Sequence, residues 1–262
     1  HELADGAWRG GADNHDEALY GPWADRRTAA FRAREEWLPI RRPDPDDPTR
    51  VYRRVPLGDL ADLVLVQAFV AEVTQKLGAP TGLVNTVGGY RGDDPVERSE
   101  WATWESMFAL NVRPTLFCSR AVLPAMREAG HGSILNVASL AAFQPLGDFA
   151  VYAAAKAYVH HFSLALAAEL EEAGITVTSL CPGPASTEFA LVASEGARPE
   201  VRHGRDAATV VRRCLADARR GRWTSVPYLS WKATAFLSRF LGKGLVARVS
   251  AKAMRRPVKR GD

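Results

Sequence analysis

Two side chains near the middle of the chain could share one proton-transfer site. Tyr152 and Lys156 are four residues apart in the run Tyr-Ala-Ala-Ala-Lys, so on a helix both project from one face. A phenol ordinarily has a pKa of about 10, and a neighbouring ammonium favours its ionised form and lowers that value. The pair could therefore act as a general acid and base, although the same spacing is also typical of an exposed helix pair without a catalytic role.

A serine upstream could complete such a site. Ser139 ends the apolar run Ser133-Ile-Leu-Asn-Val-Ala-Ser139, which follows Gly132 and is typical of a buried central strand. Parallel sheets bind ligands at the carboxyl ends of their strands, so the Ser139 hydroxyl could hold a substrate oxygen. Taken alone, a serine at a strand end carries no functional signal.

The segments that must position these residues alternate between strand-like and helix-like patterns. The expected strands are 51–57, 82–85, 133–139, 175–180 and 223–227, and the expected helices are 60–77, 101–129, 152–173 and 206–215. This alternation predicts an α/β fold in which helices cover a parallel sheet. A chain of 262 residues is long enough for one large core, so we expect a single domain.

Composition excludes several classes of protein. With 47% apolar and 24% charged residues the chain is typical of a globular protein. The net charge of +4 is not accompanied by aromatic residues interleaved with basic ones, so we expect no nucleic-acid partner. Cys118, Cys181 and Cys214 are widely spaced, which indicates neither a disulfide framework nor a metal site and favours a reducing cytoplasm.

The ends of the sequence carry no targeting signal that we can identify. No apolar run approaches the roughly 18 residues needed to span a bilayer. The opening His1-Glu-Leu-Ala-Asp5 does not have the pattern of a signal peptide. Because the chain begins with His1 rather than Met, a missing or processed natural start is an open expectation.

Several ordered motifs together resemble the short-chain dehydrogenase/reductase family. They are Leu83-Val-Asn-Thr-Val-Gly88, Leu110-Asn111-Val112, the strand ending at Ser139, Tyr152-Ala-Ala-Ala-Lys156 and Cys181-Pro-Gly-Pro-Ala-Ser-Thr187. The likeness runs from about residue 51 to about residue 190. It implies a doubly wound, Rossmann-like parallel sheet and hydride transfer between NAD or NADP and a carbonyl or alcohol.

The resemblance also implies a role for each catalytic residue. Tyr152 is the general acid in reduction and the general base in oxidation, while Lys156 lowers its pKa and holds the nicotinamide ribose. Ser139 orients the substrate oxygen. Asn111 maintains the active-site helix and a proton-relay water, with a helix kink as its alternative role.

Further positions are expected to bind the cofactor. The full set that the resemblance implies is Asp59, Asn85, Gly88, Tyr152, Lys156, Pro182, Gly183 and Thr187. Pro182, Gly183 and Thr187 would face the nicotinamide carboxamide. Asp59 would contact the adenine, or would instead cap the following helix. The segment from Asn85 to Gly88 lacks the usual second Asn and Ala of the family, which we expect to change the packing on the adenosine side.

The first 50 residues depart from the family. Its opening strand and Thr-Gly-x-x-x-Gly-x-Gly turn, which hold the cofactor phosphates, are not recognisable, so the first βαβ unit is in doubt. Gly6, Gly10 and Gly11 are expected to be ordinary loop glycines, 24–38 an amphipathic helix and 41–50 a loop or linker. We consider two origins for this segment, namely a reading-frame error or replaced exon-like segment, and natural divergence.

The end of the chain, 229–262, follows the predicted catalytic domain of 51–228 and is basic and apolar. Large apolar residues lie among lysines and arginines, at Trp231, Phe236, Phe240, Leu245 and Val249. This composition predicts either a helical lid over the substrate cleft or a segment that rests on a membrane surface. We favour the lid, because Gly242 and Gly244 interrupt a long amphipathic face.

Taken together, the sequence predicts a cytoplasmic NAD(P)(H)-dependent oxidoreductase. The residues Phe143, Pro145, Leu146 and Phe149 between Ser139 and Tyr152 suggest an apolar ketone or secondary alcohol as its substrate. The alternative is a catalytically silent relative that kept the fold for binding or scaffolding. By analogy with the family, we expect a homo-dimer or homo-tetramer paired through the helices that begin near residues 101 and 152.

Overall fold

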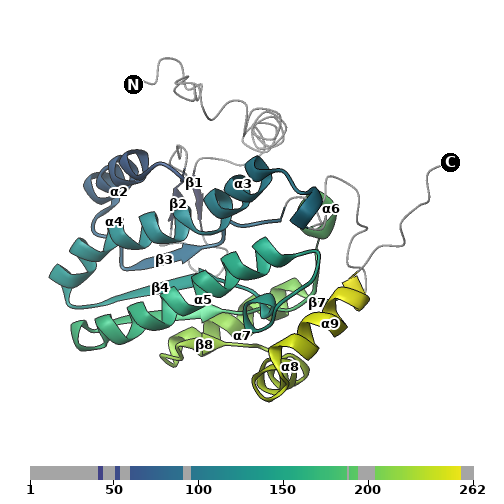
Figure 1. Cartoon of the computed structure of the whole chain (residues 1–262). Helices are drawn as coiled ribbons and strands as arrows, with labels where there is room; N and C mark the ends of the chain where they lie inside the picture. The colour runs from purple at the N-terminus through teal and green to yellow at the C-terminus, as the bar shows by residue number, and fades with distance from the viewer. Residues whose placement is uncertain are drawn as a thin grey trace.

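The computed structural model describes most of the chain from residue 60 onward. Described are residues 41–43, 51–53, 60–90, 96–187, 189–193 and 204–254. Figure 1 shows strands at the centre with helices on both sides of them. The expected α/β class, with a parallel sheet and flanking helices, is confirmed.

Four parallel strands form the central sheet of the described residues. They are β3 (Gly82–Asn85), β4 (Gly132–Val137), β5 (Ile175–Leu180) and β8 (Thr224–Ser225), in the order β3-β4-β5-β8. Each strand corresponds to a segment that the apolar runs predicted, although β8 is shorter than the expected 223–227. The register pairs Asn85 with Asn136 and Asn136 with Ser179, so three polar residues cross the sheet in one row.

The strand expected at 51–57 does not join this sheet within the described residues. Its first part, β2 (Val51–Arg53), pairs antiparallel with β1 (Arg41–Pro43), a segment that we expected to be loop. The expected strand is therefore confirmed at 51–53, but its place in the parallel sheet is wrong, and so is the expected loop at 41–43. The physical reason is the short connection, because a few residues can join antiparallel neighbours, whereas parallel neighbours need a crossover of a dozen or more.

The helix α2 (Leu63–Leu77) begins and ends with cap residues. Asp62 is its N-cap, and its carboxylate accepts from the amides of Val64 at 2.7 Å and Leu65 at 3.2 Å. Gly78 ends the helix at φ 91°, a conformation that favours glycine. Since Asp62 caps this helix, the alternative role of Asp59 as its cap is wrong.

The helical pattern expected at 101–129 is divided into two helices. They are α3 (Trp101–Asn111) and α4 (Arg113–Ala129), which meet at Val112. Pro114 lies in the first turn of α4, where its missing amide hydrogen is tolerated, but it cannot continue a hydrogen-bonded helix from α3. The next long helix, α5 (Ala150–Leu170), begins just before Tyr152, and Gly174 follows in the left-handed conformation.

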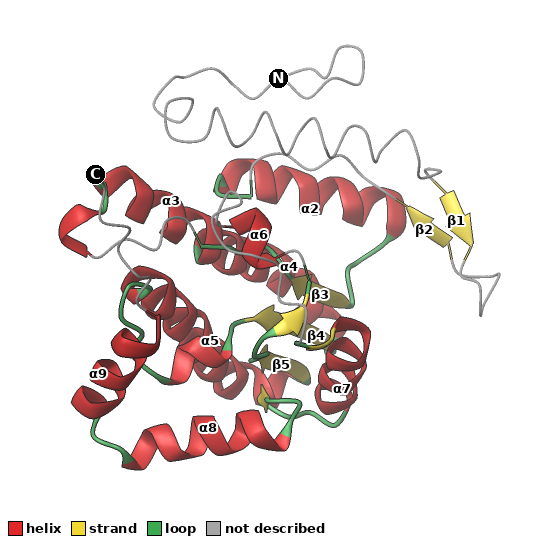
Figure 2. Cartoon of the chain, turned by 90° about the vertical axis from the view of Figure 1, so that its right-hand side faces the viewer, coloured by secondary structure: helices red, strands yellow, loops and turns green. Residues whose placement is uncertain are grey.

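The two faces of the sheet are covered unequally. On one face Ile134 and Val177 pack against α4 and α5, with Val70 of α2 at the margin. On the other face Leu135 and Leu180 pack against α7 (Ala207–Arg219), which Figure 2 shows on the opposite side of the strands from α5. Parallel sheets are normally buried on both faces, yet Val84 of β3 is 52% exposed. The edge at β3 is therefore only partly covered.

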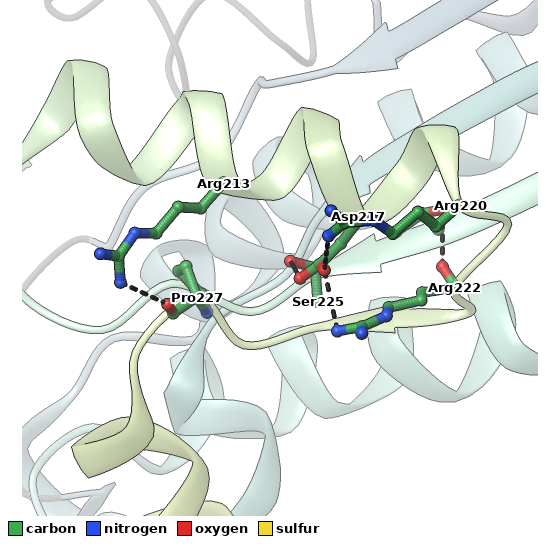
Figure 3. Close-up of polar contacts among 7 residues, drawn as sticks. Arg213, Asp217, Arg220, Arg222, Ser225 and Pro227 are labelled. Atoms are coloured by element: carbon green, nitrogen blue, oxygen red, sulfur yellow. Dashed lines mark hydrogen bonds and ion pairs between the residues drawn. The ribbon is translucent and has the colours of Figure 1, made fainter.

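A polar cluster joins α7 to β8 and the turn between them (Figure 3). The buried Asp217 carboxylate accepts from Ser225 Oγ at 2.7 Å and pairs with Arg222 Nη1 at 2.9 Å. Arg220 lies farther away, at 4.0 Å. Arg213 donates from Nη1 to the carbonyl of Pro227 at 3.1 Å, so the middle of α7 is tied to the segment that follows β8.

Two helices follow β8, and short elements fill the remaining connections. The helices are α8 (Leu229–Phe240) and α9 (Lys243–Met254), and the break between them lies at the expected glycine, Gly242. The short elements are η1 (Val96–Arg98), η2 (Leu140–Phe143), η3 (Glu171–Ala173), β6 (Ala185–Ser186), α6 (Phe189–Ala193) and β7 (Arg205–Asp206). None of the helices in the described part of the chain is long and apolar enough to cross a membrane.

Candidate active site

The carboxyl ends of β4 and β5 bring two of the predicted motifs together. The amide of Ala138 donates to the carbonyl of Leu180 at 2.8 Å, and the amide of Leu140 donates to the carbonyl of Pro182 at 2.8 Å. Ser139 lies between these two bonds and begins η2, where its hydroxyl accepts from the amide of Ala141 at 3.1 Å. The serine is therefore held at the end of the sheet where ligands bind in parallel folds.

Tyr152 lies within reach of Ser139, in the first turn of α5. The Ser139 side chain is one of the groups that shift the pKa of Tyr152, which places the two hydroxyl groups near each other. Burial raises the pKa of Tyr152, and the nearby Tyr90 phenol also raises it, while the Ser139 side chain lowers it. Burial is the largest of these effects, so the net pKa is above the ordinary value.

Lys156 is the third member of the predicted site, and it is buried in the same helix. Its Nζ donates to the carbonyl of Val137 at 3.0 Å and lies 6.0 Å from the centre of the Tyr152 ring. Burial lowers the pKa of Lys156 to about 8. The expected lowering of the Tyr152 pKa by Lys156 is not found, because the ammonium is turned toward Val137 and the burial of the phenol dominates.

Asn111 holds the loop that follows β3. Its side-chain amide donates to the carbonyls of Gly89 at 2.7 Å and Met107 at 2.8 Å, and its Oδ1 accepts from the amide of Gly89 at 3.1 Å. Asn111 is fully buried and is the last residue of α3, so a helix end lies at the residue for which a kink was the alternative role. The same bonds place the loop beside the catalytic helix.

Gly88 lies between the two buried polar side chains of this region. A Cβ atom on Gly88 would be 2.7 Å from Lys156 Nζ and 2.9 Å from Asn111 Oδ1. Only glycine allows both groups to approach the backbone this closely. The structure thus brings together Asn111, Gly88 and Lys156, and brings Ser139 next to Tyr152.

The other expected cofactor residues have different surroundings. Asn85 is buried, and its amide donates to Asn136 Oδ1 at 2.8 Å and to Ser119 Oγ at 3.4 Å. A Cβ on Gly183 would meet the Trp231 ring at 2.6 Å, so α8 packs directly on this loop. Thr187 is exposed and accepts from the amide of Phe189 at 3.3 Å. Asp59 lies outside the described residues.

Sequence reasoning missed an aromatic wall beside Tyr152. The Tyr90 ring is edge-on to the rings of Tyr152 at 5.9 Å, Phe149 at 5.2 Å and Phe189 at 5.7 Å. The Tyr90 hydroxyl donates to the carbonyl of Ala190 at 3.1 Å. The available signal was an aromatic residue directly after the Gly88-Gly89 turn, at the carboxyl end of a predicted strand.

Sequence reasoning also missed a buried polar group on α5, the helix that carries Tyr152 and Lys156. His160 is buried in α5, and its Nδ1 is 2.9 Å from Ser179 Oγ and 3.7 Å from Cys181 Sγ. Burial lowers the pKa of His160 to about 4 and raises the pKa of Cys181 to about 12, so both are expected to be neutral near pH 7. These groups are therefore suited to packing and hydrogen bonding rather than to nucleophilic chemistry.

Two family models match the chain, and their matches overlap over residues 54–77. The model of short chain dehydrogenases matches residues 54–197, which contain Asn111, Ser139, Tyr152 and Lys156. The model of PhoD-like phosphatases matches residues 1–77. The second match falls on the segment where no glycine-rich turn could be recognised.

Individual relatives and solved structures agree with the first match. Sulfoacetaldehyde reductase 2 of Chromohalobacter salexigens is 34% identical over 148 residues, which cover 56% of this chain and 59% of that protein. A short-chain dehydrogenase from Streptomyces avermitilis shares the fold with a TM-score of 0.62 at 24% identity, over 72% of this chain and 74% of that one.

A serine dehydrogenase complexed with NADP+ has a TM-score of 0.51 at 27% identity, over 69% of this chain and 67% of that one. The chain spans little more than half the length of the curated relatives that it matches. Because the dehydrogenase model matches more than half of the residues, and the motifs that it contains meet at the ends of β4 and β5, the chain belongs to the short-chain dehydrogenase family.

Proposed function

We propose that this chain is an NAD(P)(H)-dependent oxidoreductase that acts on an apolar carbonyl or secondary alcohol. The observation that carries the proposal is the proximity of the Tyr152 and Ser139 hydroxyls, with the buried Lys156 on the same helix. A phenol and a hydroxyl that lie near each other at a sheet edge can both reach a single substrate oxygen.

The chemistry divides between the cofactor and the protein. A bound nicotinamide supplies or accepts the hydride at the carbonyl carbon. In the direction of reduction, Tyr152 gives its proton to the substrate oxygen while Ser139 donates a hydrogen bond to the same oxygen. In oxidation Tyr152 accepts that proton. The raised pKa of Tyr152 favours the protonated form, which is the form that reduction requires.

The residues at the reacting end fit a nicotinamide nucleotide. Lys156 offers a buried ammonium for ribose hydroxyls, and Gly88 keeps the backbone next to it free of a side chain. We propose Asp59, Asn85, Pro182, Gly183 and Thr187 as further contacts, by their positions in the family motifs. The cofactor is NAD or NADP, and the relation to a serine dehydrogenase complexed with NADP+ favours testing NADPH first.

The aromatic wall supports an apolar substrate. Tyr90 packs edge-on against the Tyr152 ring, and Phe149 and Phe189 pack against Tyr90. Apolar walls with a few convergent polar groups are typical of small-molecule sites.

We also propose the boundaries of the catalytic domain and of the segment that follows it. Residues 51–228 form the catalytic domain, and 229–262 form a lid that packs on the connection between Ser139 and Tyr152. Ser238 Oγ donates to the carbonyl of Phe143 at 3.3 Å, and Ser250 Oγ donates to the carbonyl of Pro145 at 3.0 Å. Both acceptors lie in the segment that would cover an apolar substrate.

Assembly and location complete the proposal. The exposed rings of Phe108 on α3 and Tyr158 on α5 lie 6.0 Å apart and form an apolar surface on the two helices expected to pair subunits. A homo-dimer or homo-tetramer would bury them. The three cysteines are free and buried, which suits a reducing cytoplasm.

A second candidate function is that of a silent relative that binds or scaffolds without turnover. The observation that favours it is the match of residues 1–77 to PhoD-like phosphatases, because this match stands where the family has its phosphate-binding turn. Without such a turn the cofactor would lose the hydrogen bonds to its phosphates.

One assay separates the two candidates. Oxidation of NADPH and NADH is followed with a panel of apolar ketones, for the wild-type chain and for Tyr152→Phe. We expect the variant to lose about 10²-fold to 10⁴-fold in rate while keeping its circular dichroism spectrum. Near-full activity of Tyr152→Phe would refute the proton-transfer role, and a folded wild-type chain without turnover on any ketone would favour the silent relative.

A further inference from the structure

The helix α8 has apolar residues on two opposite faces. The inner face, formed by Trp231, Ala235 and Ser238, is buried against Gly183 and η2. The outer face carries Leu229, Phe236 and Phe240, whose exposed fractions are 82%, 58% and 72%. The packing of the lid uses only the inner face, so it does not account for the outer one.

The outer residues form one continuous stripe. Positions 229, 236 and 240 are seven and four residues apart, so they recur on the same side of an α-helix. The rings of Phe236 and Phe240 lie 4.8 Å apart, which confirms that they are neighbours on the surface. Leu237, at 54% exposure, widens the stripe. A grouped apolar patch of this kind marks an interaction surface more often than isolated apolar residues do.

Basic residues border the stripe, and acidic residues are absent from the segment. Lys232 and Arg239 are exposed and seven residues apart, so they lie along one flank of α8. From Leu229 to Gly261 the sequence contains no Asp or Glu. The patch therefore combines exposed apolar side chains with a charge of one sign.

The adjoining α9 continues both properties. Leu245 and Val249 are 55% and 60% exposed, and Lys243, Arg248 and Lys252 are exposed around them. Ser250 and Ala251 face the other way, against the loop at Pro145 and Gly147. Figure 2 shows α8 and α9 together at the margin of the fold, away from α2. We call the exposed residues of α8 and α9 the basic apolar patch.

We propose that the basic apolar patch docks this protein on the surface of a membrane that contains anionic lipids. Leu229, Phe236 and Phe240 would enter the boundary between headgroups and acyl chains, while Lys232 and Arg239 would contact the lipid phosphates. The helix would lie in the plane of the surface, since its 12 residues are too few to span a bilayer. A second copy of the chain fits this surface poorly, because two patches of the same sign would repel one another.

The test is co-sedimentation of the full chain with vesicles. One set is made of phosphatidylcholine and the other of phosphatidylcholine mixed with phosphatidylserine. We expect the wild-type chain to sediment with the anionic vesicles and to be released by added salt. The double variants Phe236→Ser/Phe240→Ser and Lys232→Ala/Arg239→Ala should each lower the affinity at least about tenfold.

A matched control has the same exposure but lies elsewhere. Val64→Ser removes an apolar side chain that is 71% exposed on α2, and it should leave vesicle binding unchanged. Circular dichroism establishes that each variant is folded. The proposal is overturned if the wild-type chain does not bind anionic vesicles, if it binds both sets equally, or if the folded double variants bind as well as the wild type. It is also overturned if the α8 variants instead convert an oligomer into a monomer in analytical ultracentrifugation.

Discussion

At the scale of single residues, the candidate site depends on the missing side chain of Gly88. Replacing Gly88 with Ala would place a Cβ 2.7 Å from Lys156 Nζ, so the buried ammonium would have to leave its position. We expect turnover to fall by about 10²-fold, because small displacements of catalytic groups are costly. The control Gly82→Ala has its nearest contact at 4.0 Å and should retain activity. Equal activity of both variants in a steady-state assay would show that Lys156 tolerates the added methyl group.

His160 is predicted to make the fold sensitive to acid. Its pKa is about 4 in the folded chain, because burial and the nearby His161 and Arg239 disfavour the charged ring, against an ordinary value of 6.5. The unfolded chain therefore binds the extra proton first as the pH falls. Stability that is present above about pH 6.5 should be lost progressively toward about pH 4, by about 3 kcal/mol.

Urea unfolding of two variants measures this contribution. His160→Gln keeps a hydrogen-bonding group near Ser179 but cannot titrate, so the fall in unfolding free energy between about pH 7 and about pH 4 should shrink by about 3 kcal/mol. His131 is exposed, and His131→Gln should behave like the wild type. An unchanged acid dependence in His160→Gln would mean that other groups cause the loss.

At the scale of elements, one carboxylate joins α7 to β8. Asp217 is buried and accepts from Ser225 at 2.7 Å and from Arg222 at 2.9 Å. Asp217→Ala should lower the unfolding free energy by about 1.5 to 3 kcal/mol, because the Ser225 hydroxyl loses its partner inside the protein. Arg220 is 4.0 Å away and exposed, so Arg220→Ala should change it by less than about 0.5 kcal/mol. Urea titration measures the unfolding free energy of both variants. Equal losses in the two variants would contradict the role of Asp217 in joining α7 to β8.

At the scale of the whole molecule, the dehydrogenase match does not include the opening of the chain. Residues 54–197 match short chain dehydrogenases and residues 1–77 match PhoD-like phosphatases. Whether the first 50 residues arose by a reading-frame error, a replaced exon-like segment or natural divergence stays a prediction that sequencing of the coding DNA tests. Val84 of β3 is exposed, and β3 lies at the edge of the described sheet, which is where a further βαβ unit would pack.

The absence of a recognisable phosphate-binding turn predicts weak nucleotide binding. The reacting end of the site has Tyr152, Lys156 and Gly183, but no described residue supplies the backbone amides of a phosphate-binding turn. We expect the chain to bind NADH and NADPH several kcal/mol more weakly than a version rebuilt with a strand and a glycine-rich turn, because charge-assisted hydrogen bonds of about 1.5 to 3 kcal/mol each are lost. Quenching of the tryptophan fluorescence reports the titration, and Trp231, which packs on Gly183, lies at the reacting end of the site. Micromolar binding by the unaltered chain would show that its opening does build a phosphate site.

The sequence alone predicted the strands and the helix that carry the proposed catalytic residues. The apolar runs predicted β3, β4 and β5, and the four-residue spacing of Tyr152 and Lys156 predicted their common helix, because both signals are local and periodic. The motif order then predicted that Ser139 and Tyr152 would meet. A local pattern also predicted the end of α2, because Gly78 follows its last residue directly. The expected helix 152–173 was too long, since α5 ends at Leu170 and Gly174 follows the 3-10 helix η3.

The tertiary structure decided what depends on long-range contacts. Only the folded chain shows that Asn111 bonds to Gly89, that Tyr90 joins the wall beside Tyr152, and that burial dominates the pKa of Tyr152, because each depends on residues far apart in the sequence. The pairing of Val51–Arg53 with Arg41–Pro43 was also missed, although these two strands are close in the sequence. The helical spacing in the sequence defines two apolar faces of α8, but it does not say which one is buried. Only the tertiary structure shows that the buried face is the one on which Trp231 packs against Gly183 and Ser238 bonds to η2.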